Sequence, residues 1–149
     1  ARWTRPVREL HRTVIVPHTP AQMFDLVADV QRYPEFVPWC ASAELLARDD
    51  TSLTGRLEMA MGPLTGKLAT RNELEPPRRM TLELVEGPFS DLQGEWLFKG
   101  LGDQGCQIDL TMRFAFSNPV KDLVLGAAFE QTCSRLVDAF VARAEDMYG

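Results

Sequence analysis

The sequence has little of what catalysis and metal binding usually require. Its 149 residues include three cysteines and two histidines, and no C-x-x-C pair brings two thiols together. The wide spacing of the cysteines excludes a zinc knuckle or a redox dithiol and favours reduced, buried thiols. His11 and His18 have no partner at metal-ligand spacing, so we expect surface or strand-end positions for both. The G-x-S-x-G, Walker and H-E-x-x-H motifs are also missing.

Long hydrophobic runs are missing too. The run from Leu123 to Phe129 is too short to span a bilayer, and the run from Thr13 to Val16 is too short for the core of a signal peptide. Hydrophobic residues make up 45% and charged residues 25% of the chain, as in ordinary globular domains. We therefore expect a single-domain cytoplasmic protein, whose contact with the inner membrane would be transient and peripheral.

Positive charge is scarce outside the N-terminus. The net charge is −5, yet residues 1–12 carry four arginines, at positions 2, 5, 8 and 12, against one glutamate. An acidic body excludes a general nucleic-acid surface such as a DNA-binding face, because neutralising phosphates requires clustered Lys and Arg. We predict a solvated, partly disordered basic arm over residues 1–9 and a single domain over residues 10–149.

The N-terminal third contains a strand and a short helix. The β-branched residues of Leu10 to Val16 predict the strand, and Thr19, Pro20 and Gln22 predict the helix start, with Thr19 as the cap. Tyr33 to Trp39 contains two prolines and cannot form a regular helix. This apolar connection has three interpretations: a gate, a patch for a membrane or partner, or a cover for the core.

Period-two alternation extends from Ala41 to Ser117 and predicts a meander of about six antiparallel strands. The clearest example alternates apolar and mostly polar residues from Cys106 to Ser117. The segment Gly100 to Gly105 matches G-x-G-x-x-G, but a strand follows it rather than a helix. Since phosphate binding by this motif needs a helix N-terminus, we interpret the segment as a hairpin turn.

A long helix closes the chain. Asn118 and Pro119 predict its start, and it extends to Tyr148, about 30 residues or roughly 45 Å. The predicted core-facing stripe consists of Val120, Leu123, Val124, Ala127, Val137, Phe140, Val141 and Ala144. The predicted fold class is therefore α+β: a curved antiparallel sheet of about six or seven strands wrapped around the C-terminal helix, with one or two short helices after the first strand.

A curved sheet around a single helix leaves part of its concave side unfilled. We expect an apolar cavity of roughly 300–1,000 Å³ there, with methionines as adaptable lining. Thr70 and Asn72 share the apolar face of their strand, where a buried amide needs a hydrogen bond. That bond is either structural or a contact for a ligand head group. Gly126, in the middle of the helix, either lets the helix approach the sheet or leaves room for a ligand.

Two groups of residues carry a resemblance to a known family: Asp29-Val30, Tyr33-Pro34, Phe36, Pro38 and Cys40, and later Thr70-Arg71-Asn72, Gly87-Pro88-Phe89, Leu92, Gly94, Trp96 and Phe98. They resemble the coenzyme Q-binding branch of the START-like lipid-transfer superfamily, whose members are often labelled polyketide or oligoketide cyclases. The similarity covers about Thr13 to Tyr148 and is greatest to bacterial ribosome-association toxins.

The resemblance implies the helix-grip fold, with a ubiquinone-like lipid as a non-covalent ligand and a role supporting respiration. It also implies two alternatives, binding to the large ribosomal subunit and polyketide cyclisation, although the sequence shows no acid–base pair for a cyclase. We therefore predict a non-catalytic, lipid-binding protein. The candidate ligand-binding residues are Phe36, Trp39, Met59, Met61, Leu68, Thr70, Asn72, Leu84, Trp96, Phe114 and Val137.

Overall fold

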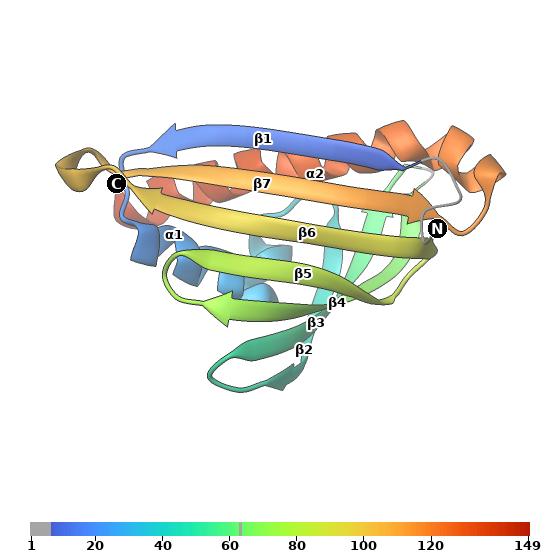
Figure 1. The fold of residues 1–149 in the computed structure, drawn as a ribbon, viewed down its shortest axis with the longest axis horizontal. Helices are drawn as coiled ribbons and strands as arrows, with labels where there is room; N and C mark the ends of the chain where they lie inside the picture. The colour runs from blue at the N-terminus through green and yellow to red at the C-terminus, as the bar shows by residue number, and fades with distance from the viewer. Residues whose placement is uncertain (1–6, 63) are drawn as a thin grey trace.

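The computed structural model describes residues 7–62 and 64–149, and within them seven antiparallel strands curve around one long helix (Figure 1). The strand order is β1-β7-β6-β5-β4-β3-β2. This confirms the predicted architecture. The elements in chain order are β1 (Arg8–Val16), α1 (Pro20–Ala28), the 3-10 helix η1 (Val30–Glu35), β2 (Cys40–Arg48), β3 (Ser52–Met61), β4 (Leu64–Glu75), β5 (Arg79–Glu86), β6 (Phe89–Gly100), the 3-10 helix η2 (Gly102–Gln104), β7 (Cys106–Phe116) and α2 (Pro119–Tyr148).

Local capping sets the helix starts. The Thr19 hydroxyl accepts from the backbone N–H of Gln22 at 3.1 Å, and the Gln22 side chain accepts from the N–H of Thr19 at 2.9 Å. The Asn118 side chain accepts from the N–H of Lys121 at 2.8 Å. Each cap satisfies backbone donors that a helix start leaves without partners. The predicted starts of both α-helices are therefore confirmed.

Two turn-rich segments also follow their predictions. The G-x-G-x-x-G segment links β6 to β7, where Gly100 pairs with Cys106, and its interior forms only η2. This hairpin has no long helix behind it to receive a phosphate. The segment after α1 contains Pro34 within η1, a 3-10 helix rather than an α-helix.

The first strand begins earlier than predicted. It starts at Arg8, which pairs with Phe114 of β7, whereas the pattern placed its start at Leu10. The predicted basic arm of residues 1–9 therefore contributes Arg8 and Glu9 to the sheet. Residues 1–6, with Arg2 and Arg5, lie outside the described part of the chain.

The two described arginines of this region bind α2. Nε of Arg8 donates to Asp122 at 3.0 Å, and Arg12 donates to the Ser134 carbonyl at 2.6 Å and to Asp138 at 2.5 Å. A Cβ at Gly126 would lie 2.0 Å from Nε of Arg8. Gly126 therefore makes room for the Arg8 guanidinium of β1, which is a form of the first role considered from the sequence, a close approach of helix and sheet.

The core-facing stripe of α2 differs from the prediction in its first turns. Val120, Leu123, Val124 and Ala127 are exposed. Leu123 is 82% exposed, because the first turns extend beyond the sheet (Figure 1). The buried face consists of Gly126, Phe129, Thr132, Cys133, Val137, Phe140 and Ala144. Among residues 7–62 and 64–149, no helix combines the length and apolar character that a membrane-spanning helix needs.

Candidate functional site

An apolar cavity lies between the concave face of the sheet and α2. Its volume is about 80 Å³, room for a few water molecules. The side chains around it come from the α1–η1 segment, from the five strands β3 to β7 and from α2. The lining consists of Val27, Val30, Tyr33, Trp39, Gly55, Leu57, Leu68, Thr70, Asn72, Met80, Leu82, Leu92, Trp96, Leu110, Met112, Phe129, Thr132, Cys133 and Leu136.

The cavity is much smaller than the range expected from the sequence. The α1–η1 segment places Val27, Val30 and Tyr33 against the concave face. A Cβ at Gly55 would lie 3.0 Å from a methyl carbon of Val30, so η1 packs closely onto β3. The sequence left Tyr33 to Trp39 open between a gate, a surface patch and a cover for the core, and it did not place Val27 or Val30 over the cavity. In the structure Val27, Val30 and Tyr33 occupy space that a sheet and one helix alone would leave open.

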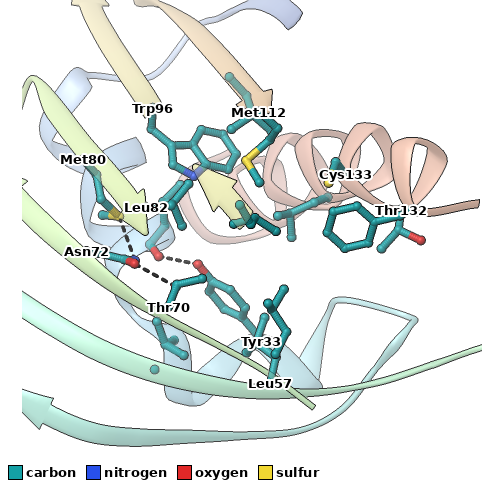
Figure 2. A pocket seen from close by; sticks show the side chains of 18 of the residues that line it. Tyr33, Leu57, Thr70, Asn72, Met80, Leu82, Trp96, Met112, Thr132 and Cys133 are labelled. Atoms are coloured by element: carbon teal, nitrogen blue, oxygen red, sulfur yellow. Dashed lines mark hydrogen bonds between the residues drawn. The ribbon is translucent and has the colours of Figure 1, made fainter. Parts of the chain in front are cut away.

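A short chain of hydrogen bonds forms the polar part of the lining (Figure 2). The Thr70 hydroxyl donates to the Asn72 side-chain oxygen at 2.8 Å, and the Asn72 amide donates to the Met80 sulfur at 3.6 Å. Asn72 is 4% exposed, as the alternation predicted. Because a thioether is a weak acceptor and the amide has a second N–H, Asn72 keeps donor capacity for a ligand oxygen.

Tyr33 and Cys133 are the ionisable residues of this lining, and burial keeps both protonated. The Tyr33 hydroxyl donates to the Val27 carbonyl, and burial raises the pKa of the phenol well above its ordinary value. Burial, with a smaller contribution from Glu130, raises the pKa of Cys133 to about 12. The described lining therefore provides neither a general base nor an activated nucleophile near neutral pH.

The other two cysteines are also buried thiols. Cys40 and Cys106 are unpaired, and burial raises the pKa of each to about 11. The predicted reduced and buried state of the three cysteines agrees with these positions. No group of three or more His, Cys, Asp or Glu side chains suited to a metal ion occurs in the described residues.

The structure brings five of the predicted ligand-binding residues together around the cavity: Trp39, Leu68, Thr70, Asn72 and Trp96. Five others lie elsewhere. Met59, Phe114 and Val137 are buried in the core, Leu84 is half-buried outside the lining, and Phe36 lines a groove on the surface.

Met61 belongs to the backbone of β3, but its side chain lies outside the described part of the structure. The three displaced strand residues, Met59, Leu84 and Phe114, have a common explanation. Alternation tells which face of a strand a side chain occupies, but an inward side chain borders a cavity only where no neighbour fills the space before it. Phe114, for example, packs its ring 4.7 Å from that of Phe129.

Sequence reasoning missed all four residues on the α2 side of the cavity. Phe129, Thr132, Cys133 and Leu136 recur at helical spacing and line it. This periodicity was available in the sequence, but the apolar residues of the first turns suggested a different stripe. The Thr132 hydroxyl donates to the Ala128 carbonyl at 2.8 Å, so its described hydrogen bond stays within the helix.

Known proteins share this architecture. Residues 16–141 match the family described as polyketide cyclase / dehydrase and lipid transport. The chain belongs to this family. It is 39% identical to the ribosome association toxin RatA of Pseudomonas aeruginosa over 140 residues, which cover 94% of this chain and 97% of that protein.

Two further similarities are more distant. The mitochondrial coenzyme Q-binding protein COQ10 homolog B of Xenopus laevis is 28% identical over 132 residues, covering 86% of this chain and 54% of that protein. The crystal structure of the Zhui aromatase/cyclase from Streptomyces sp. R1128 aligns with a TM-score of 0.86 at 21% identity, covering 97% of each chain. The fold is therefore the helix-grip fold of the START-like superfamily, as the sequence resemblance indicated.

Proposed function

We propose that the protein binds a hydrophobic small molecule, a ubiquinone-type polyprenyl quinone, without catalysing a reaction. The observation that carries this proposal is an apolar cavity whose polar contacts come from Thr70 and Asn72. A benzoquinone ring has an apolar perimeter and two carbonyl acceptors. The free donor capacity of Asn72 suits one such carbonyl.

The chemistry of the lining supports binding over turnover. Cyclisation of a polyketide requires proton transfers, and the ionisable lining residues Tyr33 and Cys133 are protonated near neutral pH. The likeness to the aromatase/cyclase structure is a likeness of fold. The relative named as a coenzyme Q-binding protein supports a quinone as the ligand.

The small volume implies that the ligand opens its own site. Met80 and Met112, whose unbranched side chains change rotamer readily, line the cavity on neighbouring parts of the sheet. We infer that they rearrange when a quinone head enters. Such a carrier would take its lipid from the inner membrane by transient contact and support respiration by holding quinone in a protected form.

The direct test is mass spectrometry of organic extracts from natively purified protein, beside a mock purification from cells that lack the tagged chain. We expect a polyprenyl quinone that is enriched with the protein and absent from the mock sample. Protein isolated empty would then be incubated with excess ubiquinone and repurified. Failure both to carry and to take up any polyprenyl quinone would contradict the proposed function.

A second candidate function is association with the ribosome, which the notable identity to the toxin RatA favours. The large subunit would be the partner. Of the N-terminal arginines, Arg8 and Arg12 already pair with acidic residues of α2, so they are poor phosphate ligands in this conformation. Arg2 and Arg5 are therefore the first positions to test.

The ribosome experiment is co-sedimentation with purified large subunits at low and high salt. Binding through phosphates predicts co-sedimentation that weakens with salt and with the variant Arg2→Ala/Arg5→Ala. The matched control is Arg48→Ala, at the end of β2. Absence of co-sedimentation at low salt would remove this candidate and leave the lipid proposal unaffected.

A further inference from the structure

A groove on the surface lies next to the cavity, between the segment after η1 and the second half of α2. Its volume is about 450 Å³, within the range of sites that hold drug-sized ligands. Phe36 and Pro38 form one wall, and Ala139 and Ala142 form the other. The alanines lie three residues apart on one helix face, so their small side chains leave the groove open.

Contacts with η1 and α2 fix the position of Phe36 at the groove. The Phe36 ring packs 6.0 Å from the Tyr33 ring and 5.5 Å from the Phe140 ring, between centroids. The Arg143 guanidinium lies 5.0 Å above Phe36 and donates to Glu35 at 2.8 Å. These contacts join η1 and Phe36 to α2, so the groove does not depend on one loose side chain.

Trp39 separates the groove from the cavity, since it lines both. The residue is 5% exposed, and its Nε1–H is buried without a hydrogen-bond partner in the described part of the chain. Buried indole N–H groups usually have an acceptor, and one without a partner is unfavourable. An oxygen of a ligand that passes the indole would supply the missing acceptor.

We infer that the groove holds the apolar tail of the lipid whose head occupies the cavity, and that Trp39 is the partition the ligand displaces. This inference rests on the proposed function. The cavity alone is too small for a lipid, whereas the groove beside it has the volume of an ordinary ligand site. The assignment of head and tail follows from chemistry: the buried amide of Asn72 is in the cavity, and the groove walls are apolar.

The charged residues of the groove fit this orientation. Arg135 and Asp138 are exposed, and Asp138 is already paired with Arg12 at 2.5 Å. Their charges can stay in water while the tail follows Ala139 and Ala142. A tail of several isoprene units would extend along the groove towards solvent or a membrane surface.

The experiment compares a tailless and a tailed quinone by equilibrium dialysis. The probes are 2,3-dimethoxy-5-methyl-1,4-benzoquinone and decylubiquinone, which share a head group. The variants Ala139→Leu and Ala142→Leu fill the groove, and Ala127→Leu adds the same bulk on an exposed face of α2 away from it. We expect the groove variants to weaken decylubiquinone binding about tenfold, because a few methylene groups lose their burial. Binding of the tailless quinone and both affinities of Ala127→Leu should stay unchanged.

A substitution of Trp39 can test its hydrogen-bond donor separately from the size of its side chain. Trp39→Phe removes the Nε1–H and keeps an aromatic ring, so we expect both quinones to bind several-fold more weakly. A purely structural role for Trp39 would instead lower the thermal midpoint and leave both affinities unchanged. That result would overturn the assignment of Trp39.

The outcomes separate this inference from the proposed function. If wild-type protein binds neither quinone, the proposed function fails. If wild-type protein binds both and the groove variants bind decylubiquinone as tightly as wild type, the groove assignment fails while the proposed function stands. If the groove variants change the oligomeric state rather than the affinity, the groove belongs to a second copy of the chain, and the inference is wrong.

Discussion

Two neighbouring parts of the interior contain the same kind of alternating strands, but they pack differently. In the aromatic cluster of Phe89, Phe114, Phe116 and Phe129, every pair of ring centroids lies between 4.7 and 6.3 Å apart. The cavity, by contrast, is bordered largely by aliphatic and thioether side chains, including Met80, Leu82 and Met112. Rings in edge-to-face and tilted contact fill their space, whereas flexible side chains around a buried amide leave a volume that a ligand can enlarge.

The largest expected difference between the two regions is in stability. Phe114→Ala removes a fully buried ring from the cluster, and we expect it to lower the free energy of unfolding by about 3–5 kcal/mol. Leu82→Ala, at a half-buried position beside existing space, should lower it by less than about 2 kcal/mol. Urea unfolding measures both. Equal losses would show that the cavity region is packed as tightly as the cluster.

A second difference is in the pH dependence of stability. Burial raises the pKa of the cavity thiol Cys133 from 9.0 to about 12, so the folded state holds this proton more tightly than the unfolded state does. The contribution to stability is complete below pH 9 and is lost as the pH rises towards 12, by at most about 1.4 kcal/mol per pH unit.

The measurement is the free energy of unfolding in urea at pH 8, 9 and 10, under reducing conditions. Cys133→Ala should flatten the alkaline decline, although its stability at pH 8 can be lower. Since other groups also titrate there, the difference in slope between the two proteins is the readout. Equal slopes would mean that the Cys133 thiol is not as strongly buried as the structure shows.

Thr70 and Asn72 should contribute more to the affinity for a quinone than to the free energy of unfolding. Thr70→Val/Asn72→Leu replaces both partners by apolar groups of similar size, so we expect the free energy of unfolding to change by less than about 1 kcal/mol. Loss of the donor for a quinone carbonyl should weaken decylubiquinone binding about tenfold. The control is Thr54→Val, on the outer face of β3. Unchanged affinity in the double variant would exclude Thr70 and Asn72 from the head-group site.

The smallest expected effect lies where α2 extends past the sheet. Leu123→Gln changes a side chain that is 82% exposed and should alter the free energy of unfolding by no more than about 0.5 kcal/mol. Thermal unfolding compared with Val137→Ala, a buried position on the same helix, measures this contrast. A large loss in Leu123→Gln would restore the core-facing stripe that the sequence pattern predicted.

The parts of the fold that the sequence predicts are those set by residues close together in the chain. The alternation of strands, the caps at Thr19 and Asn118, and the hairpin at Gly100 to Gly105 depend on residues close together in the chain, and each prediction agrees with the structure. Asn72 was placed on the inner face for the same reason.

The cavity depends on contacts that are distant in the sequence. Tyr33 from η1 lines it opposite strands that follow much later, and Phe114 is kept from it by Phe89 and Phe129. The position of Arg8 over Gly126 joins residues more than a hundred positions apart. Periodicity carries no information on such pairings, so the size of the cavity and most of its lining could not be predicted.

The most direct test of the central claim is NMR of protein labelled with ¹³C at the methionine methyl groups, titrated with decylubiquinone. Met80 and Met112 line the cavity, whereas Met23 is buried outside its lining and Met147 is exposed near the end of α2. We predict that the Met80 and Met112 signals shift and that those of Met23 and Met147 do not. Saturable binding without a shift of the Met80 and Met112 signals would contradict the claim that the ligand occupies this cavity.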